Sequence, residues 1–345
     1  MPIHELPLVI QTSYAELVDL LRVQSASDFP AGSTFRKREI SGKAYWYVQE
    51  PTGPTGRPPE RYLGPDTAEL AAAIEKGQAA KADADARKAI IRSLKGAGIP
   101  EPDTITAAVI EALADAGVFR LRGVIVGTVA FQTYAGLLGV KLPGAAIRTG
   151  DVDIAQDYGV AVAIDDSVDA PFLDILKQVD KRFAPVPHIS SPTAATTYAR
   201  PGGCRVDVLT TNRGKERDEP VPLPSLKTDA VPLRFMDFLL KETVQAAMLS
   251  KTGALVNVPT PERYAVHKLI VATMRHSSGE SAAKSDKDIA QAVTLIEALA
   301  AKRRLDDFKS ALAEAKKRGA GWRERIEEGM ARLPETSRAL VETRK

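Results

Sequence analysis

Two aspartates alternate with apolar residues in the segment Asp151-Val152-Asp153-Ile154. Residues i and i+2 of an extended strand project from one face, so we expect both carboxylates on one side and the apolar residues in the core. Adjacent carboxylates repel each other unless a cation lies between them. An all-oxygen ligand set suits a hard divalent ion, and the pair therefore predicts a site for Mg²⁺ or Mn²⁺.

A third aspartate, Asp207, occupies a second apolar segment, between Val206 and Val208. If this strand lies beside the first, three carboxylates meet, and such a site can hold two metal ions. One ion would activate an attacking hydroxyl and the other would grip a triphosphate. The alternative is that the aspartates are unrelated surface residues of half-buried strands. Their order along the chain, after a glycine turn, favours a shared site.

That glycine turn is Gly127-Thr128, which closes an apolar strand and opens a helix. Gly127 lets a phosphate approach the backbone, and the start of the helix supplies amide donors and the positive end of its dipole. Thr128 adds a hydroxyl. Many α/β proteins have a glycine at such a turn, so this motif indicates a phosphate site only in combination with the aspartates that follow it.

The elements that must position these residues fall into four stretches, and the fold class is α+β. A small antiparallel β segment (1–66) contains strands at 32–40, 43–50 and 61–64, and a polar helical linker (67–100) follows, capped by Asp66 or Thr67. An α/β core with a mixed sheet (101–225) comes next, with a long loop expected over 211–230. The last stretch (226–345) is expected to be a helical domain, with helices starting at Pro261 and spanning roughly 285–301 and 303–330.

The ordered motifs resemble the nucleotidyltransferase superfamily of DNA polymerase β, in which a glycine turn precedes Asp-x-Asp/Glu and a later strand supplies a third acid. Gly127, Thr128, Asp151, Asp153 and Asp207 match that pattern. Thr128 stands where the family usually has Gly or Ser, and the 22-residue spacer before Asp151 is longer than usual. The resemblance implies Mg²⁺ (or Mn²⁺) as cofactor and all three aspartates as catalytic metal ligands.

The chain also resembles AbiEii-type bacterial nucleotidyltransferases, and most closely an uncharacterised bacterial group whose core follows a Tyr/Trp-bearing β segment ending in Tyr-Leu-Gly, here 62–64. This likeness implies that Arg148 and Lys268 bind nucleotide, with Lys268 reaching the triphosphate as a point charge. In these relatives, a helical Lys is likewise followed by an Arg and a Lys-Asp pair. The alternative for Lys268 is a solvated helix face.

The composition of the chain indicates a cellular compartment and the partners that it permits. A single cysteine, Cys204, among 345 residues cannot form an internal disulfide, which fits a reducing compartment. We find no run of 18 apolar residues and no signal-type N-terminus, so we expect a cytoplasmic protein without a membrane partner. Residues 302–345 contain 13 Lys or Arg against 8 Asp or Glu. This excess permits a nucleic-acid partner, although a solvated helical face also explains it.

These expectations combine into one function: an NTP donates a nucleoside monophosphate, as in ATP-binding transferases, to a hydroxyl acceptor and pyrophosphate is released. The acceptor favoured is an RNA 3′ end, because the N-terminal strands carry both basic and aromatic residues, although those aromatics can equally form a small core against the next helix. Two alternatives stay open. One is AMP transfer to a protein, as in a toxin, and the other is a non-catalytic nucleotide-binding module of the same fold.

Overall fold

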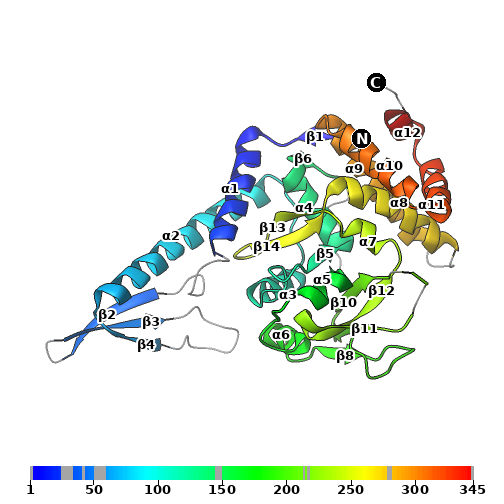
Figure 1. Ribbon diagram of the computed structural model, residues 1–345. Coiled ribbons are helices and arrows are strands. Elements are labelled where there is room, and N and C mark those ends of the chain that lie inside the picture. The colour runs from blue at the N-terminus through cyan, green and yellow to red at the C-terminus, as the bar shows by residue number, and fades with distance from the viewer. Residues whose placement is uncertain are drawn as a thin grey trace.

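The computed structural model describes residues 3–24, 34–40, 43–49, 60–143, 150–212, 214–215, 218–277 and 282–342. Helices surround a mixed central sheet, and a long helix carries a small separate sheet away from that body (Figure 1). The α+β class expected from the sequence is confirmed. No helix in the described ranges is both long and apolar enough to cross a membrane.

The central sheet has the strand order β11-β12-β10-β7-β5, with β9 beside the first half of β10 and β8 beside β9. The pairs β10–β7 and β10–β12 are parallel, whereas β5–β7 and β11–β12 are antiparallel. The strands are β5 (Val124–Val126), β7 (Asp151–Gln156), β8 (Ala184–Val186), β9 (Thr197–Arg200), β10 (Cys204–Thr211), β11 (Val221–Leu223) and β12 (Thr228–Leu233).

Helices and a hairpin cover this sheet and complete one continuous hydrophobic core. The helices of the central region are α3 (Thr104–Asp115), α4 (Gly127–Leu138), α5 (Tyr158–Ala163), α6 (Phe172–Val179) and α7 (Met236–Leu239). The hairpin consists of β13 (Thr243–Met248) and β14 (Ala254–Pro259). The C-terminal helices are α8 (Pro261–Ser277), α9 (Ala282–Ala301), α10 (Leu305–Lys317), α11 (Ala320–Ala331) and α12 (Glu335–Glu342).

The N-terminal region forms an arm. Helix α1 (Leu8–Gln24) packs against the C-terminal half of α2 (Ala68–Gly96) through buried side chains such as Leu21 and Leu94. The Thr67 hydroxyl caps α2 by accepting from the Leu70 amide, as expected. The other end of α2 carries the antiparallel sheet β2 (Thr34–Ile40), β3 (Lys43–Gln49) and β4 (Glu60–Pro65) (Figure 1). A two-stranded ribbon, β1 (His4–Glu5) with β6 (Val140–Lys141), joins the chain start to the core.

Three local expectations were wrong. The stretch 211–230 is not one long loop, because β11, a 3₁₀ turn (Pro224–Leu226) and the start of β12 lie within it. The hairpin β13–β14 lies where only helices were expected. The helix expected over 303–330 is two helices, since Gly319 between them has φ +142° and interrupts the helical backbone.

The predicted boundary at 225/226 falls between two strands of the same sheet, because β12 pairs with β10 beyond it. Side chains on both sides of that point, from Val109 to Leu333, belong to one buried cluster. Sheet and C-terminal helices therefore share a core. The division of the chain into four domains stays a prediction.

Candidate active site

The parallel pairing of β7 with β10 places Asp153 directly opposite Asp207. Both strands are held by fully buried neighbours, Val152 and Ile154 on one and Val206 and Val208 on the other. Side chains alternate between the two faces of a sheet, so the aspartates share the face opposite to these apolar side chains. The register also places Asp151 opposite Arg205, which completes a square of four charged residues.

The turn at Gly127 lies against this square. Val126, the last residue of β5, pairs with Asp153, and Gly127 then starts α4 with φ +66°. A Cβ atom at Gly127 would come within 2.0 Å of the Asp153 Oδ2. Only glycine fits both the backbone conformation and this close approach. The sequence-predicted turn and the first aspartate pair are therefore in contact.

Asp153 is mostly buried beside other carboxylates. Burial above all, and then the negative charges of Asp207 and Asp151, raise the pKa of Asp153 to about 6, although Lys268 and Arg275 partly offset the rise. A bound cation would favour the ionised form against both burial and the neighbouring carboxylates.

Asp207 has two partners from the chain itself. Its Oδ1 accepts from the Thr197 hydroxyl at 2.6 Å, and Arg205 Nε lies 3.0 and 2.9 Å from its two oxygens. The Arg205 side chain is 52% exposed, and the charges of Asp207, Asp151 and Asp153 all raise its pKa. Arg205 is thus the counter-ion of the square in this structure.

A group of cations approaches the same turn from helices α8 and α9. The Lys268 ammonium donates to Asp288 Oδ1 at 2.6 Å, and Arg275 donates to the other oxygen at 2.7 Å. Lys287 donates to the Thr128 hydroxyl at 2.9 Å, and burial together with Lys268 lowers its pKa. Two cations therefore share the buried carboxylate of Asp288 and a third, Lys287, contacts the glycine turn, a charge balance that favours an anionic ligand.

Tyr264 fixes these helices to the turn. Its hydroxyl lies 2.8 Å from the Gly127 carbonyl and 3.1 Å from Gln291 Oε1 on α9. The Lys268 ammonium lies 5.2 Å from the centre of the same ring. Tyr264, which is fully buried, thus links the glycine turn to both helices that carry the cations.

The structure brings together Gly127, Thr128, Asp153 and Asp207, with Asp151 at the exposed start of β7. Lys268 is buried in an ion pair rather than on a solvated helix face. Arg148 lies outside the described residues. Arg275, Lys287 and Asp288 are the Arg and the Lys-Asp pair that follow Lys268 in the sequence pattern, whereas no pattern in the sequence pointed to Arg205. The seven-residue spacing of Lys268 and Arg275 on one helix was a usable signal for that cluster.

The donor set fits a divalent cation, because it consists of carboxylate oxygens with excess negative charge around Asp153. Among the residues that the structure describes, however, no three acidic, histidine or cysteine side chains stand grouped closely enough to hold an ion. The Arg205 guanidinium contacts both oxygens of Asp207.

A separate cavity of about 430 Å³ lies at the opposite end of β7, next to Asp157, and Arg122 and Asn257 line it. The six residues of β7 put about 17–20 Å between the two ends of the strand. This cavity is therefore distinct from the site around the carboxylates.

The comparison with family models identifies the family of this chain. A sequence model of a nucleotidyltransferase family matches residues 104–317, more than half of the chain. The matched range contains the glycine turn, the three aspartates and the cation cluster on α8 and α9. No curated protein and no solved structure shows a significant match. The chain belongs to this nucleotidyltransferase family.

Proposed function

We propose that the protein transfers a nucleoside monophosphate from an NTP to a hydroxyl acceptor in a Mg²⁺- or Mn²⁺-dependent reaction, with an RNA 3′ end as acceptor. The observation that carries the proposal is the placement of Asp153 and Asp207 opposite each other, in contact with a glycine turn and beside three cations. Carboxylates for a metal ion and cations for phosphates are the two needs of phosphoryl transfer.

In the reaction, the acceptor oxygen bonds to the α-phosphorus while the bond from that phosphorus to the bridging oxygen breaks and pyrophosphate leaves. A bound divalent ion would neutralise phosphate charge and lower the pKa of the attacking hydroxyl. Asp151, Asp153 and Asp207 would hold it. Gly127 and Thr128 would contact the phosphates through backbone amides and the hydroxyl, with Arg148 as a further proposed nucleotide ligand.

We propose Lys268, Arg275 and Lys287 as the side chains that bind the triphosphate. Lys287 already contacts Thr128, so a phosphate at the turn would meet its ammonium. Lys268 would have to exchange part of its contact with Asp288 for a phosphate oxygen. Such positioning and charge neutralisation account for most of the catalysis in phosphoryl transfer.

The key experiment removes one charge, with Asp207→Asn. The variant keeps the size and hydrogen bonding of the side chain, so folding should survive. We expect NTP affinity to stay near the wild-type value and label transfer from α-³²P NTPs to cellular RNA to fall by at least about 10²-fold. Unchanged transfer would remove Asp207 from the mechanism.

The same assay separates the alternatives. Label that appears in protein instead of RNA would support AMP transfer to a protein hydroxyl. NTP binding without transfer to either pool, with every NTP and with both metals, would support the binding module. The closer likeness to AbiEii-type and other bacterial proteins, and a cytoplasmic location, stay predictions.

A further inference from the structure

The three-stranded sheet on α2 has two different faces. Val48 is fully buried and pairs with Phe35 on the face toward α2, where Ile74 is also buried. Lys37 and Trp46 pair with each other on this face and both donate to Asp66. The inner face therefore forms a small core against α2, and its lysine has an acidic partner. Of the three aromatic residues expected in such a core, only Trp46 lies on this face, whereas Tyr45 and Tyr47 lie on the other.

The outer face alternates arginine and tyrosine. Register pairs Arg36 with Tyr47 and Arg38 with Tyr45, so all four side chains project from the side away from α2. Both arginines are exposed and both tyrosines are partly exposed. The Arg38 guanidinium lies 4.9 Å from the centre of the Tyr47 ring, which holds the two groups in one layer.

We infer that this outer face binds a single-stranded stretch of the RNA acceptor, upstream of the 3′ end that enters the active site. Two rings on an open sheet can stack bases, and two guanidinium groups among them can contact phosphates, which is the pairing that single strands require. The charge of the face complements a polyanion. The inference rests on the proposed function, because it takes RNA as the acceptor.

The position of the sheet sets what it can do. The 29 residues of α2 span about 43 Å, and the sheet lies at the end of this helix that points away from the central body (Figure 1). A surface so placed cannot contact the reacting nucleotide. It acts as a remote anchor, which adds affinity for long acceptors and none for very short ones.

The test measures binding of a fluorescein-labelled, unstructured 12-nucleotide RNA by anisotropy, without NTP and with the full chain. We expect Tyr45→Leu/Tyr47→Leu to weaken binding about tenfold or more, whereas Tyr45→Phe/Tyr47→Phe, which keeps both rings, binds like the wild type. Far-ultraviolet circular dichroism checks that each variant is folded. The rescue by phenylalanine separates stacking from a loss of the sheet.

The arginines are tested against a matched control on the same arm. Arg36→Ala/Arg38→Ala should weaken binding and reduce the slope of log affinity against log salt by about 1.4, the value for two phosphate contacts on a single strand. Lys88→Ala/Arg92→Ala removes the same charge from exposed positions of α2 and should change affinity less than about twofold. Equal losses in both pairs would overturn the assignment of the outer face.

Other ligands of the outer face would give different results in these experiments. If inorganic polyphosphate of similar charge binds as tightly as the RNA and the leucine variant binds RNA normally, the face is not a base-stacking surface and the inference fails. RNA binding that depends on the tyrosines, in a protein that transfers no label, would refute the proposed function but keep the surface. If the tyrosine variants transfer label to long RNA as well as the wild type does, the inference about the surface fails and the proposed function stands.

Discussion

At the residue scale, the site is a square in which three carboxylates face one guanidinium. Asp153 opposes Asp207, and Asp151 opposes Arg205. The Arg205 guanidinium therefore offsets part of the negative charge of these carboxylates. Asp153 is the carboxyl of the three whose pKa is raised, to about 6, chiefly by burial.

The ionised form of Asp153 lowers the stability of the folded protein at neutral pH. Its folded pKa of about 6 lies above the ordinary value of 3.8, so the folded state binds more protons between those limits. Stability should therefore decrease as pH rises from about 4 to 6 and stay reduced above that. Asp153→Asn should raise the free energy of unfolding by roughly 1–2 kcal/mol at pH 7.5 in EDTA, and the melting temperature should rise with it. At pH 4 both increases should be much smaller.

Thermal melts of both proteins across pH 4–8 check this difference. Asp151→Asn is the control, because Asp151 is exposed at the start of β7 and its replacement should leave the difference small. Addition of Mn²⁺ should raise the melting temperature of the wild type and not that of the Asp153 variant. A variant that melts lower than the wild type at every pH would contradict the electrostatic account.

At the scale of elements, the glycine turn depends on helices that begin more than 130 residues later. Tyr264 on α8 contacts the carbonyl of Gly127, and Lys287 on α9 contacts the side chain of Thr128. Between these helices, Asp288 is 1% exposed and bridges Lys268 and Arg275. A shift of either helix would therefore move the phosphate-binding groups relative to the carboxylates.

Asp288→Asn tests the bridge. Loss of this carboxylate leaves two cations beside each other with little water, so we expect destabilisation by about 3 kcal/mol. Pyrophosphate should restore part of the melting temperature, and should stabilise the variant more than the wild type, since it supplies the missing negative charge. Asp286→Asn on the same helix is the control, because that ion pair with Arg332 is 73% exposed at the aspartate and should matter little. Equal effects of both changes would refute the bridge.

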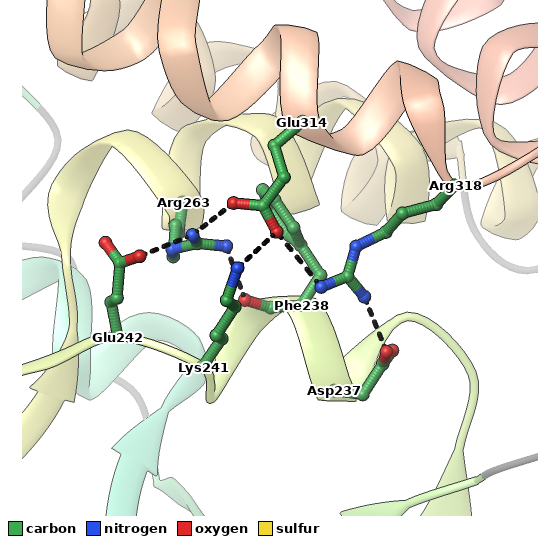
Figure 2. A network of polar contacts seen from close by, with 7 residues as sticks. All are labelled: Asp237, Phe238, Lys241, Glu242, Arg263, Glu314 and Arg318. Carbon is green, nitrogen blue, oxygen red and sulfur yellow. Dashed lines mark hydrogen bonds and ion pairs between the residues drawn. The ribbon is translucent and has the colours of Figure 1, made fainter.

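At the scale of the whole molecule, one polar network fastens the C-terminal helices to the body. Figure 2 shows Arg263 of α8 between Glu242 and Glu314, with Arg318 joining Glu314 to Asp237 of α7. The Arg263 side chain is 2% exposed and stacks 4.7 Å from the Phe238 ring centre. Ion pairs around the buried Arg263 guanidinium therefore connect α7, α8 and α10.

Arg263→Ala should destabilise the protein by about 2–4 kcal/mol, because it empties a buried position and removes a partner from two carboxylates. Burial opposes ionisation of Glu314, but hydrogen bonds from Arg263, Lys241 and Arg318 lower its pKa to about 2. The stabilisation from this carboxylate is present above pH 4.5 and is lost as pH falls toward 2.

Urea unfolding at pH 7 and pH 3 measures both effects, and the gap between wild type and variant should narrow at pH 3. Arg304→Ala, whose side chain is 45% exposed in ion pairs with Glu262 and Asp307, is the matched control. A gap that stays constant with pH would assign the loss to packing alone.

The sequence by itself determined the features that depend on near neighbours. Alternation fixed the faces of Asp151 and Asp153, Thr67 set the start of α2, and Gly127 marked the turn, because caps, strand periodicity and positive φ angles are local properties. The same local rules failed for β11 to β14, whose short strands are stable only through partners elsewhere in the chain.

Only the tertiary structure decided which charges meet. Parallel strands need a long crossover, so the register that sets Asp153 against Asp207 joins residues 54 positions apart and cannot be calculated from either segment alone. The same holds for Lys268, which looked equally suited to solvent until Asp288 was found beside it. Burial and the pKa of Asp153 follow from those long-range contacts, because both depend on what the rest of the chain places around a side chain.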